Sequence, residues 1–375
     1  MAAQGFEANG KPIKVLMTAD AVGGVWQYSV DLLRGLGKDA EVLLVTFGPR
    51  PSAEQKQQLK STSVQFRESD YALEWMSNPW RDITAAGEWL LALQAEFGAD
   101  LIHLNGYAHA ALPWQKPVVV VAHSCVYSWW RAVHRCPPTP EWIEYHRRVA
   151  NGLSACHAVV APSLFMADEV EREYSTPSEK VRVIYNFSAA PPTPAMLNEP
   201  FCLAAGRLWD KAKNLSLLAE IAPHLRWPIY LAGDERGPEN PVAVPDSLRL
   251  LGHLPHTELL GYMSRARLFL HPAVYEPFGL SVLEAARRGC CLVLADIPSF
   301  RELWSESALF IDPRRPEDWI QAVNQLTNHP EQCSRLGESA RKHARRYSEQ
   351  SSIAAYQRLY RSLLAGQTHG SGAAA

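Results

Sequence analysis

Short apolar runs alternate with helical patterns along the first half of the chain. In the helical stretches, apolar residues recur at every third or fourth position, as at Tyr28, Leu32 and Leu36. Short runs that are mostly apolar are typical of strands in a parallel sheet, and a nearly pure valine run such as 118–123 is typical of a strand buried on both faces. The mostly apolar runs lie at 13–18, 41–47, 64–66, 101–105, 118–123, 158–162 and 181–186. Their alternation with helices predicts a doubly wound α/β domain.

The same alternation resumes after a proline-rich stretch. Residues 188–200 contain several prolines and no regular apolar pattern, which predicts a linker. Further strands are predicted at 200–206, 229–233, 248–254, 268–270, 292–295 and 308–311. We therefore expect a first domain over 1–187, a second domain over 201–346 and a last helix over 347–364. The low-complexity tail 365–375 is expected to be disordered.

Two glutamates stand in the stretch 268–296, whose pattern predicts a strand, a loop, a helix and a strand. Glu276 lies in the loop and Glu284 on the helix, with Gly279 where the loop tightens and Ser281, a capping residue type, close by. The first turn of a helix has unpaired N–H groups that can hold a phosphate. A carboxylate can accept hydrogen bonds from two neighbouring hydroxyl groups. Two carboxylates that flank an anion site could therefore bind a nucleotide-sugar, one holding the sugar and the other the ribose on the far side of the diphosphate. Two solvent-facing glutamates on an ordinary βαβ element are the simpler alternative.

Cations follow the strand predicted at 200–206. Arg207 stands first, and Lys211 and Lys213 follow before the next helix. An arginine binds two phosphate oxygens at once and a lysine adds a point charge, so such a pair suits a leaving diphosphate. A solvated Arg-Lys pair at a helix start is the alternative.

Polar residues end several strands of the first domain. His103, Asn105 and His123 stand at strand ends, where open α/β sheets bind ligands. Gly23 and Gly24 separate the first strand from its helix, as in a phosphate-binding loop, although a tight turn would also explain them.

Aromatic residues follow His123. The segment 126–131 is predicted to be a loop that carries Trp129 and Trp130. Because aromatic faces stack on sugar rings, this loop could form an acceptor wall. The alternative for this aromatic-rich region is a core-facing helix stripe, which the spacing of Trp142, Tyr145 and Val149 indicates.

These motifs together resemble those of GT-B glycosyltransferases, most closely the retaining family 4. The similar elements are the two glutamates eight positions apart, the strand-end His123, and Gly206-Arg207 followed by a lysine next to Asn214. The resemblance implies two Rossmann-like domains facing each other across a cleft, with the acceptor on the first and the nucleotide-sugar on the second. It also implies that the helix over 347–364 crosses back onto the first domain.

The resemblance implies a metal-independent, retaining transfer of a hexosyl group, with UDP-glucose as the donor type, to a hydroxyl acceptor. The acceptor could be a carbohydrate, a lipid-linked saccharide or a small molecule. Glu276 would bind donor hydroxyls, and His123 would donate a hydrogen bond to the sugar or to the developing charge. The other implied contacts are the diphosphate with Arg207, Lys213, Gly279, Leu280, Ser281, Gly23 and Gly24; the ribose with Glu284; the nucleobase with His253 and Leu254; and the acceptor with Trp129, Trp130 and Asn105.

Two other functions remain open on the same motifs. A sugar-nucleotide epimerase would use the same diphosphate site without an acceptor. A catalytically silent sugar-nucleotide binding protein would keep the fold, although every charged anchor of the family is present here.

Composition narrows the range of partners and cofactors. A formal net charge of −2 offers no basis for nucleic-acid binding. The seven cysteines are an odd number and show no C-x-x-C spacing, so free thiols are expected. Glycosyltransferases that bind the diphosphate through a divalent ion generally have a D-x-D triplet, and this sequence has none, so no metal is expected. No other cofactor is expected either.

The sequence shows neither a signal peptide nor a run of roughly 18 consecutive apolar residues, so we expect a cytoplasmic protein. The basic run 341–346 predicts a solvated helix face, with peripheral contact to anionic lipid as the alternative.

Overall fold

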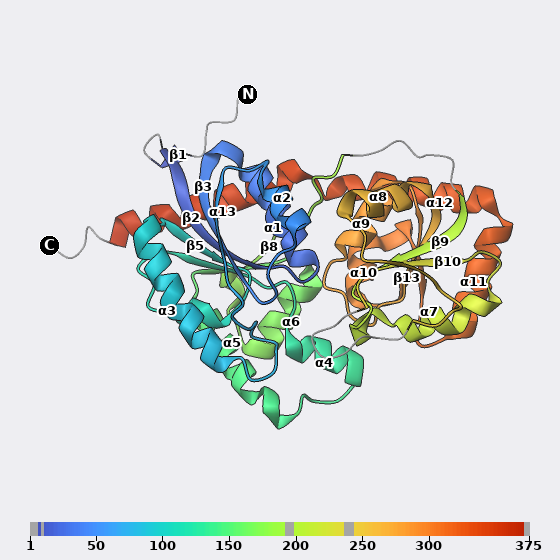
Figure 1. Cartoon of the computed structure of the whole chain (residues 1–375), viewed down its shortest axis with the longest axis horizontal. Coiled ribbons are helices and arrows are strands. Elements are labelled where there is room, and N and C mark those ends of the chain that lie inside the picture. The colour runs from blue at the N-terminus through green and yellow to red at the C-terminus, as the bar shows by residue number, and fades with distance from the viewer. Residues whose placement is uncertain (1–6, 9–10, 192–198, 236–243, 371–375) are drawn as a thin grey trace. The chain divides into compact units, whose positions relative to one another are not determined.

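The computed structural model describes residues 7–8, 11–191, 199–235 and 244–370, which form two compact units (Figure 1). The first unit comprises the chain up to Ser128, Pro137–Ala189 and the chain from Glu349 onward. The second comprises Trp129–Cys136 and Ala190–Ser348. Residues 192–198 of the expected linker and 371–375 of the expected tail lie outside the described residues.

The first unit is built on a parallel sheet in the order β4-β3-β2-β5-β6-β7-β8, with β1 antiparallel at β2. Each predicted strand of this half is present. The strands are β1 (Glu7–Ala8), β2 (Lys11–Asp20), β3 (Ala40–Phe47), β4 (Val64–Glu68), β5 (Leu101–Leu104), β6 (Val118–Val121), β7 (Ala158–Ala161) and β8 (Val181–Val183). The prediction of a doubly wound parallel sheet is confirmed.

Helices cover both faces of this sheet. They are α1 (Gly24–Leu36), α2 (Ala53–Leu59), α3 (Trp80–Phe97), α5 (Ile143–Ala155), α6 (Leu164–Tyr174) and α13 (Glu349–Gly370), with α4 (Val126–His134) starting in this unit. Apolar residues of α3, α5 and α6 form one core cluster with one face of the strands. Helices α1 and α13 pack together (Figure 1).

Helix α13 packs within the first unit through a buried polar network. Tyr28 of α1 donates a 2.6 Å hydrogen bond to Tyr356, and Tyr360 lies 2.7 Å from Nδ1 of His103. The expected return of the last helix to the first domain is confirmed, and this helix continues to Gly370 instead of ending at 364. His103, expected to face a ligand, is instead fully buried against α13, and burial lowers its pKa to about 3.

The second unit contains a six-stranded parallel sheet in the order β11-β10-β9-β12-β13-β14. Its strands are β9 (Glu199–Ala205), β10 (Ile229–Ala232), β11 (Arg249–Gly252), β12 (Ala266–His271), β13 (Cys291–Ala295) and β14 (Leu309–Ile311). Its helices are α7 (Leu215–Ile221), α8 (His256–Arg265), α9 (Leu280–Arg287), α10 (Pro298–Trp304), α11 (Pro316–Asn328) and α12 (Pro330–His343). The second unit is thus also Rossmann-like, as predicted.

Two local predictions were wrong. The segment 126–131 is not a loop but most of helix α4. At the start of this helix the thiol of Cys125 accepts a hydrogen bond from the backbone N–H of Ser128. Cysteine thus takes the place of the usual capping residue types, Ser, Thr, Asp and Asn. Ser281 does not cap α9, because the N-cap is Gly279, whose φ of 85° suits a residue without a side chain.

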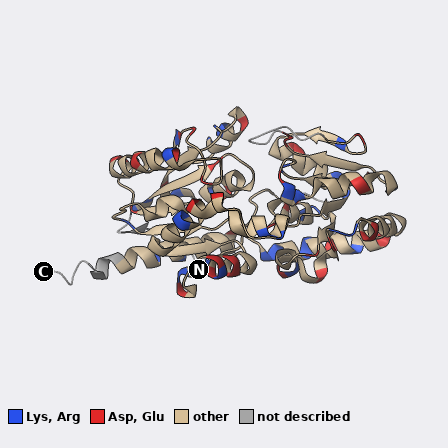
Figure 2. Cartoon of the chain, turned by 90° about the horizontal axis from the view of Figure 1, so that it is seen from below, with Lys and Arg blue, Asp and Glu red and all other residues tan. Residues whose placement is uncertain are grey.

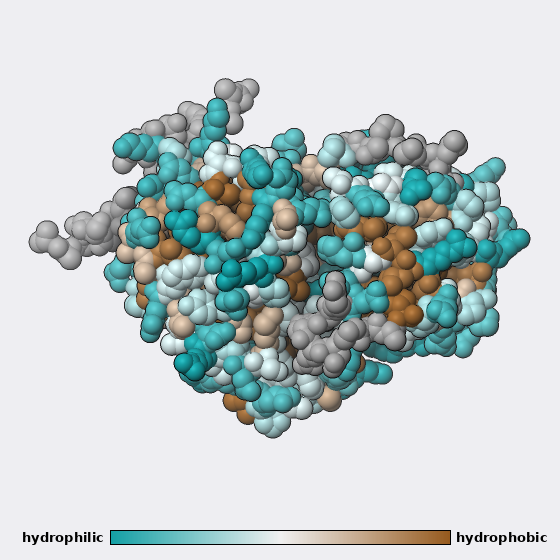
Figure 3. Space-filling model, in the orientation of Figure 1, coloured by the Kyte–Doolittle hydropathy of each residue, from teal (hydrophilic) through white to brown (hydrophobic). Residues whose placement is uncertain are grey.

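The surface is mostly polar. Lys and Arg are interspersed with Asp and Glu on both units (Figure 2). Hydrophilic residues cover most of the face seen in Figure 3, with smaller apolar patches between them. None of the helices in the described part of the chain combines the length and apolar character that a membrane span requires. All seven cysteines have free thiols, as expected.

Two helical glycines in the second unit provide a matched test of the packing. A Cβ on Gly337 of α12 would lie 2.2 Å from the carbonyl oxygen of Gly289, whereas a Cβ on Gly261 of α8 would meet nothing within 4 Å. We expect Gly337→Ala to lower the free energy of unfolding by about 1–3 kcal/mol. Gly261→Ala should raise it by about 0.5–1 kcal/mol. Urea denaturation of both variants checks this, and equal effects would contradict the close approach.

Candidate functional site

The loop after β9 is organised by the carboxylate of Asp210. One oxygen of Asp210 accepts from the backbone N–H of Ala212 at 3.0 Å and so caps the 3₁₀ turn Lys211–Lys213. The other oxygen accepts from the guanidinium of Arg207 at 2.6 Å. Arg207 is thus held just beyond the end of a central strand, where ligands of open α/β sheets bind.

The structure distinguishes between the two candidate lysines. Lys213 donates to Glu276 at 2.6 Å, whereas Lys211 is exposed. The two loops are also joined through their backbones, because Val274 donates to the carbonyl of Ala212 at 2.9 Å. The Arg207 loop and the Glu276 loop therefore form one continuous structure.

Glu276 is ionised in this setting. Burial raises the pKa of its carboxyl group, but the ammonium of Lys213 and a hydrogen bond with His271 outweigh burial and bring the pKa well below its usual value. His271 lies at 3.3 Å from the same oxygen, and burial lowers the pKa of its imidazole. At neutral pH the cluster is thus a carboxylate between an ammonium and a neutral imidazole.

Helix α9 begins directly after this cluster. The loop before it is fixed by Ser299, whose hydroxyl donates to the carbonyl of Glu276 at 2.6 Å. The backbone N–H groups of Leu280 and Ser281 fall in the first turn, where they lack intrahelical acceptors. This helix start can therefore supply N–H donors to an anion beside Glu276.

Glu284 lies further along α9, and its side chain is only 5% exposed. One of its oxygens is 2.7 Å from Nε2 of His256, the first residue of α8. His253 and Leu254 lie in the turn just before that helix, after β11. The predicted ribose contact and the predicted nucleobase contacts are thus close to each other in the second unit.

His123 is held by Asn105 in the first unit. The amide nitrogen of Asn105 donates to the carbonyl of Thr18 at 2.7 Å, so its amide oxygen faces Nε2 of His123, 2.8 Å away. Since an amide oxygen only accepts, Nε2 of His123 must carry the hydrogen. Burial lowers the pKa of His123 to about 3, which leaves the ring neutral and Nδ1 an acceptor. In this tautomer the remaining ring nitrogen, Nδ1, can only accept a hydrogen bond, whereas the sequence led us to expect a donor.

Gly23 and Gly24 lie at the start of α1, in the same unit as His123. Gly23 is the N-cap residue with a φ of 81°, and both glycines are exposed. A positive φ of this size favours glycine, so the pair leaves the helix start open to a ligand.

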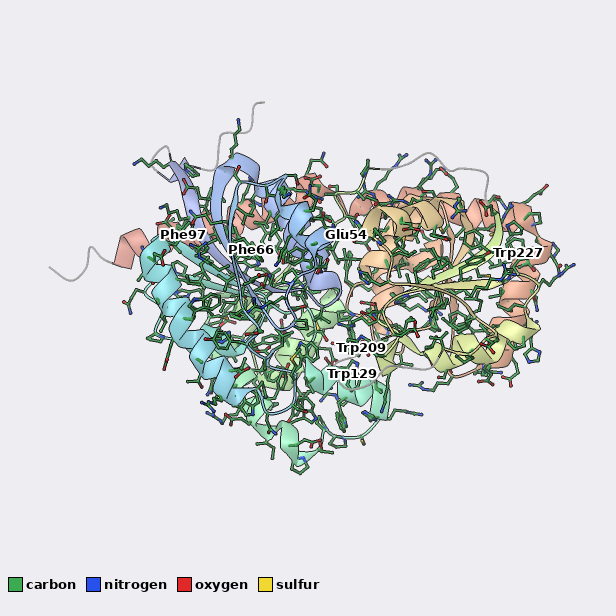
Figure 4. All side chains as sticks on the ribbon, in the orientation of Figure 1. Glu54, Phe66, Phe97, Trp129, Trp209 and Trp227 are labelled. Carbon is green, nitrogen blue, oxygen red and sulfur yellow. The ribbon has the colours of Figure 1, made fainter. Side chains whose placement is uncertain are left out.

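The two tryptophans of α4 have different surroundings. The indole N–H of Trp129 donates to Asp210 at 3.0 Å, and Figure 4 shows Trp129 near Trp209. Trp130 packs against His134, with ring centroids 4.4 Å apart. Trp129 therefore joins the Arg207 loop, a contact that the sequence did not predict.

Within the second unit the structure brings Arg207, Lys213, Glu276 and the start of α9 into one connected cluster. Sequence reasoning missed two residues of this cluster, Asp210 and His271, and it also missed His256, which contacts Glu284. Each is adjacent to a predicted motif, but only Asp210 carried a readable signal, as a capping residue type before a turn.

The chain matches two family models in succession. The model of Glycosyltransferase Family 4 matches residues 22–187, and that of Glycosyl transferases group 1 matches residues 191–343. The O-antigen chain mannosyltransferase RfbU of Salmonella typhimurium is 23% identical over 197 residues, which cover 48% of this chain and 54% of RfbU. The chain thus spans about half the length of this curated relative.

Solved structures share the fold. Sucrose-phosphate synthase from Thermosynechococcus elongatus superposes with a TM-score of 0.74 at 17% identity, covering 94% of this chain and 100% of that one. Anabaena HepE in complex with UDP and glucose gives a TM-score of 0.73 at 15% identity, with the same coverage. Together with the two consecutive family matches, which extend over most of the sequence, this GT-B architecture leads to one conclusion: the chain belongs to glycosyltransferase family 4.

Proposed function

We propose that the protein transfers a hexosyl group, with retention and without a metal ion, from a nucleoside-diphosphate sugar to a hydroxyl acceptor. The observation that carries the proposal is the cluster of Arg207 and Lys213 with Glu276 at the start of α9. Two cations and a set of helix N–H groups can stabilise the diphosphate as it leaves. We expect UDP-glucose as the donor type.

The residues have distinct roles in this proposal. Arg207 and Lys213 bind the diphosphate together with the N–H groups at the start of α9. Gly23 and Gly24, which carry no side chains, let a ligand come close to the backbone at the start of α1. Glu276 binds donor hydroxyls and is not assigned as a covalent nucleophile, because its position in the family's motif favours binding. His123 accepts a hydrogen bond from a sugar hydroxyl. The acceptor enters on the face from which the diphosphate departs.

Incubation with UDP-glucose and other nucleotide-sugars in the presence of EDTA tests the activity. Release of nucleoside diphosphate that depends on an added acceptor supports transfer. Interconversion of the sugar without an acceptor would indicate an epimerase instead, and binding without either reaction would indicate a silent binding protein. RfbU is named as a mannosyltransferase and HepE was solved with UDP and glucose, so the panel should include GDP-mannose beside UDP-glucose.

The ribose contact gives a separate prediction. We expect Glu284→Gln to weaken binding of the preferred nucleoside diphosphate about tenfold, because a charged acceptor for two ribose hydroxyls is lost. Calorimetry should compare the nucleotide with its 2′,3′-dideoxy analogue, which the variant and the wild type should bind with similar affinity. Glu258→Gln, at an exposed position of α8, is the matched control. Unchanged discrimination between the two nucleotides in Glu284→Gln would contradict the ribose role.

A further inference from the structure

The carboxylate of Asp210 collects three hydrogen bonds while its side chain is only 4% exposed. Arg207 donates to one oxygen, and the backbone N–H of Ala212 and the indole N–H of Trp129 donate to the other. Burial raises the pKa of Asp210, but Arg207 and Lys213, followed by the indole N–H, bring it below its usual value. The group is therefore a carboxylate with a defined orientation.

Trp129 reaches this carboxylate from a distant part of the sequence. It lies 81 positions before Asp210, on the part of α4 that belongs to the second unit. An indole N–H can only donate, so the direction of this hydrogen bond is unambiguous. Removing the indole N–H would leave the Asp210 carboxylate with one hydrogen-bond donor fewer, and water could not readily replace it because Asp210 is buried.

Arg207 is held from two directions. Its guanidinium carbon lies 5.3 Å from the ring centre of Trp209, and one terminal nitrogen bonds Asp210. The side chain is 38% exposed, which leaves part of the guanidinium fork accessible to a ligand. Its position therefore depends on where Asp210 points.

The charges of the cluster balance. Arg207 is paired with Asp210, and Lys213 is paired with Glu276. An arriving diphosphate must therefore share Arg207 with Asp210. Because Trp129 and Ala212 donate to one carboxylate oxygen, only the other oxygen faces Arg207. Without the indole N–H, the carboxylate could turn and hold both arms of the guanidinium fork.

We propose that Trp129 and Asp210 are positioning residues for donor binding. The indole N–H orients the carboxylate, and the carboxylate holds Arg207 where it meets the diphosphate of the nucleotide-sugar. This inference rests on the proposed function, since it requires that Arg207 binds the diphosphate. It assigns Trp129 to the donor side, in place of the acceptor wall that the sequence suggested.

Calorimetric titration with UDP, GDP and ADP, without any acceptor, tests the inference. Trp129→Phe keeps the aromatic ring and removes the N–H, so we expect the dissociation constant of the preferred nucleotide to rise about tenfold, the loss typical of one hydrogen bond to a charged group. Asp210→Asn is a second variant and should also weaken binding, because its amide presents donors to Arg207. Trp227→Phe is the matched control, since Trp227 lies away from Trp209 within the second unit (Figure 4). Thermal unfolding of each variant checks that it folds.

A double mutant shows whether the effect passes through Arg207. In the Arg207→Ala background, Trp129→Phe should cause no further loss of affinity. An unchanged affinity of Trp129→Phe alone, or an equal loss with and without Arg207, would overturn the proposal. If the wild-type protein binds none of the three nucleotides and none of the corresponding nucleotide-sugars, the proposed function fails instead.

Discussion

Lys213→Met is expected to lower kcat/KM for sugar transfer by a factor of about 10²–10³, because it removes a cation that we propose stabilises the departing diphosphate. The same change removes the ammonium partner of Glu276. The carboxylate of Glu276 then remains buried, with neutral His271 as its neighbour. Breaking a buried pair in this way is typically costly, so the free energy of unfolding should also fall. Steady-state kinetics with a nucleotide-sugar and urea denaturation at pH 7 measure the two effects.

Lys211→Met is the matched control for this prediction. It removes the same charge two positions away, on an exposed side chain, and should change kcat/KM by less than about twofold. Similar losses in the two variants would mean that general electrostatic attraction, and not the Lys213–Glu276 pair, supports the reaction. Because the folded protein lowers the pKa of Glu276, this carboxylate adds to the free energy of unfolding at every pH above its ordinary pKa. That contribution is lost as the pH falls from the ordinary pKa toward the lowered one. In Lys213→Met this dependence should weaken.

His123→Phe is expected to lower kcat about 10²-fold while nucleotide affinity stays nearly unchanged, because we propose that the acceptor nitrogen contacts the sugar and not the diphosphate. The neutral Nδ1 of His123 is an acceptor over the whole working range, since its pKa is lowered to about 3. The rate profile of the wild type between pH 5.5 and 8 should therefore show no step from this group. Rapid-quench kinetics and NMR of the imidazole nitrogens measure the rate and the tautomer.

The stability of the first unit should depend on pH through the same imidazole. Its folded pKa is lowered, so the unfolded chain takes up the proton first, and stability is lost as the pH falls from about 6.5 toward 3. His123→Phe should flatten this slope, whereas His224→Phe, at an exposed position, should not. A step in activity near pH 6.5 that disappears in His123→Phe would contradict the neutral acceptor role.

Much of the fold could be predicted because its signals are local. Runs such as 118–121 and 291–295 are apolar throughout, and this pattern predicts buried parallel strands without reference to the rest of the chain. Gly279 and Gly23 were found for the same reason, as both stand where a strand-to-helix loop tightens. Helix α4 was missed because a cysteine thiol, and not one of the usual capping residue types, closes its first turn.

The partners within the site could not be predicted in the same way. Lys213 and Glu276 are 63 positions apart, Trp129 and Asp210 are 81 apart, and Glu284 and His256 are 28 apart. A motif shows which residue types lie near a strand end, but it does not show which side chains meet. His103 illustrates the limit, since its strand-end position suggested a ligand and its neighbour proved to be Tyr360.

The sequence by itself determined two α/β halves and the positions of the charged motifs at their strand ends, because periodicity and loop chemistry act over a few residues. Only the tertiary structure decided that Lys213 is the lysine that meets Glu276, that His123 keeps its hydrogen on Nε2, and that an indole N–H supports the carboxylate behind Arg207. Each of these depends on a hydrogen bond between segments that are brought together when strands from distant parts of the chain pair in one sheet or when helices pack against it.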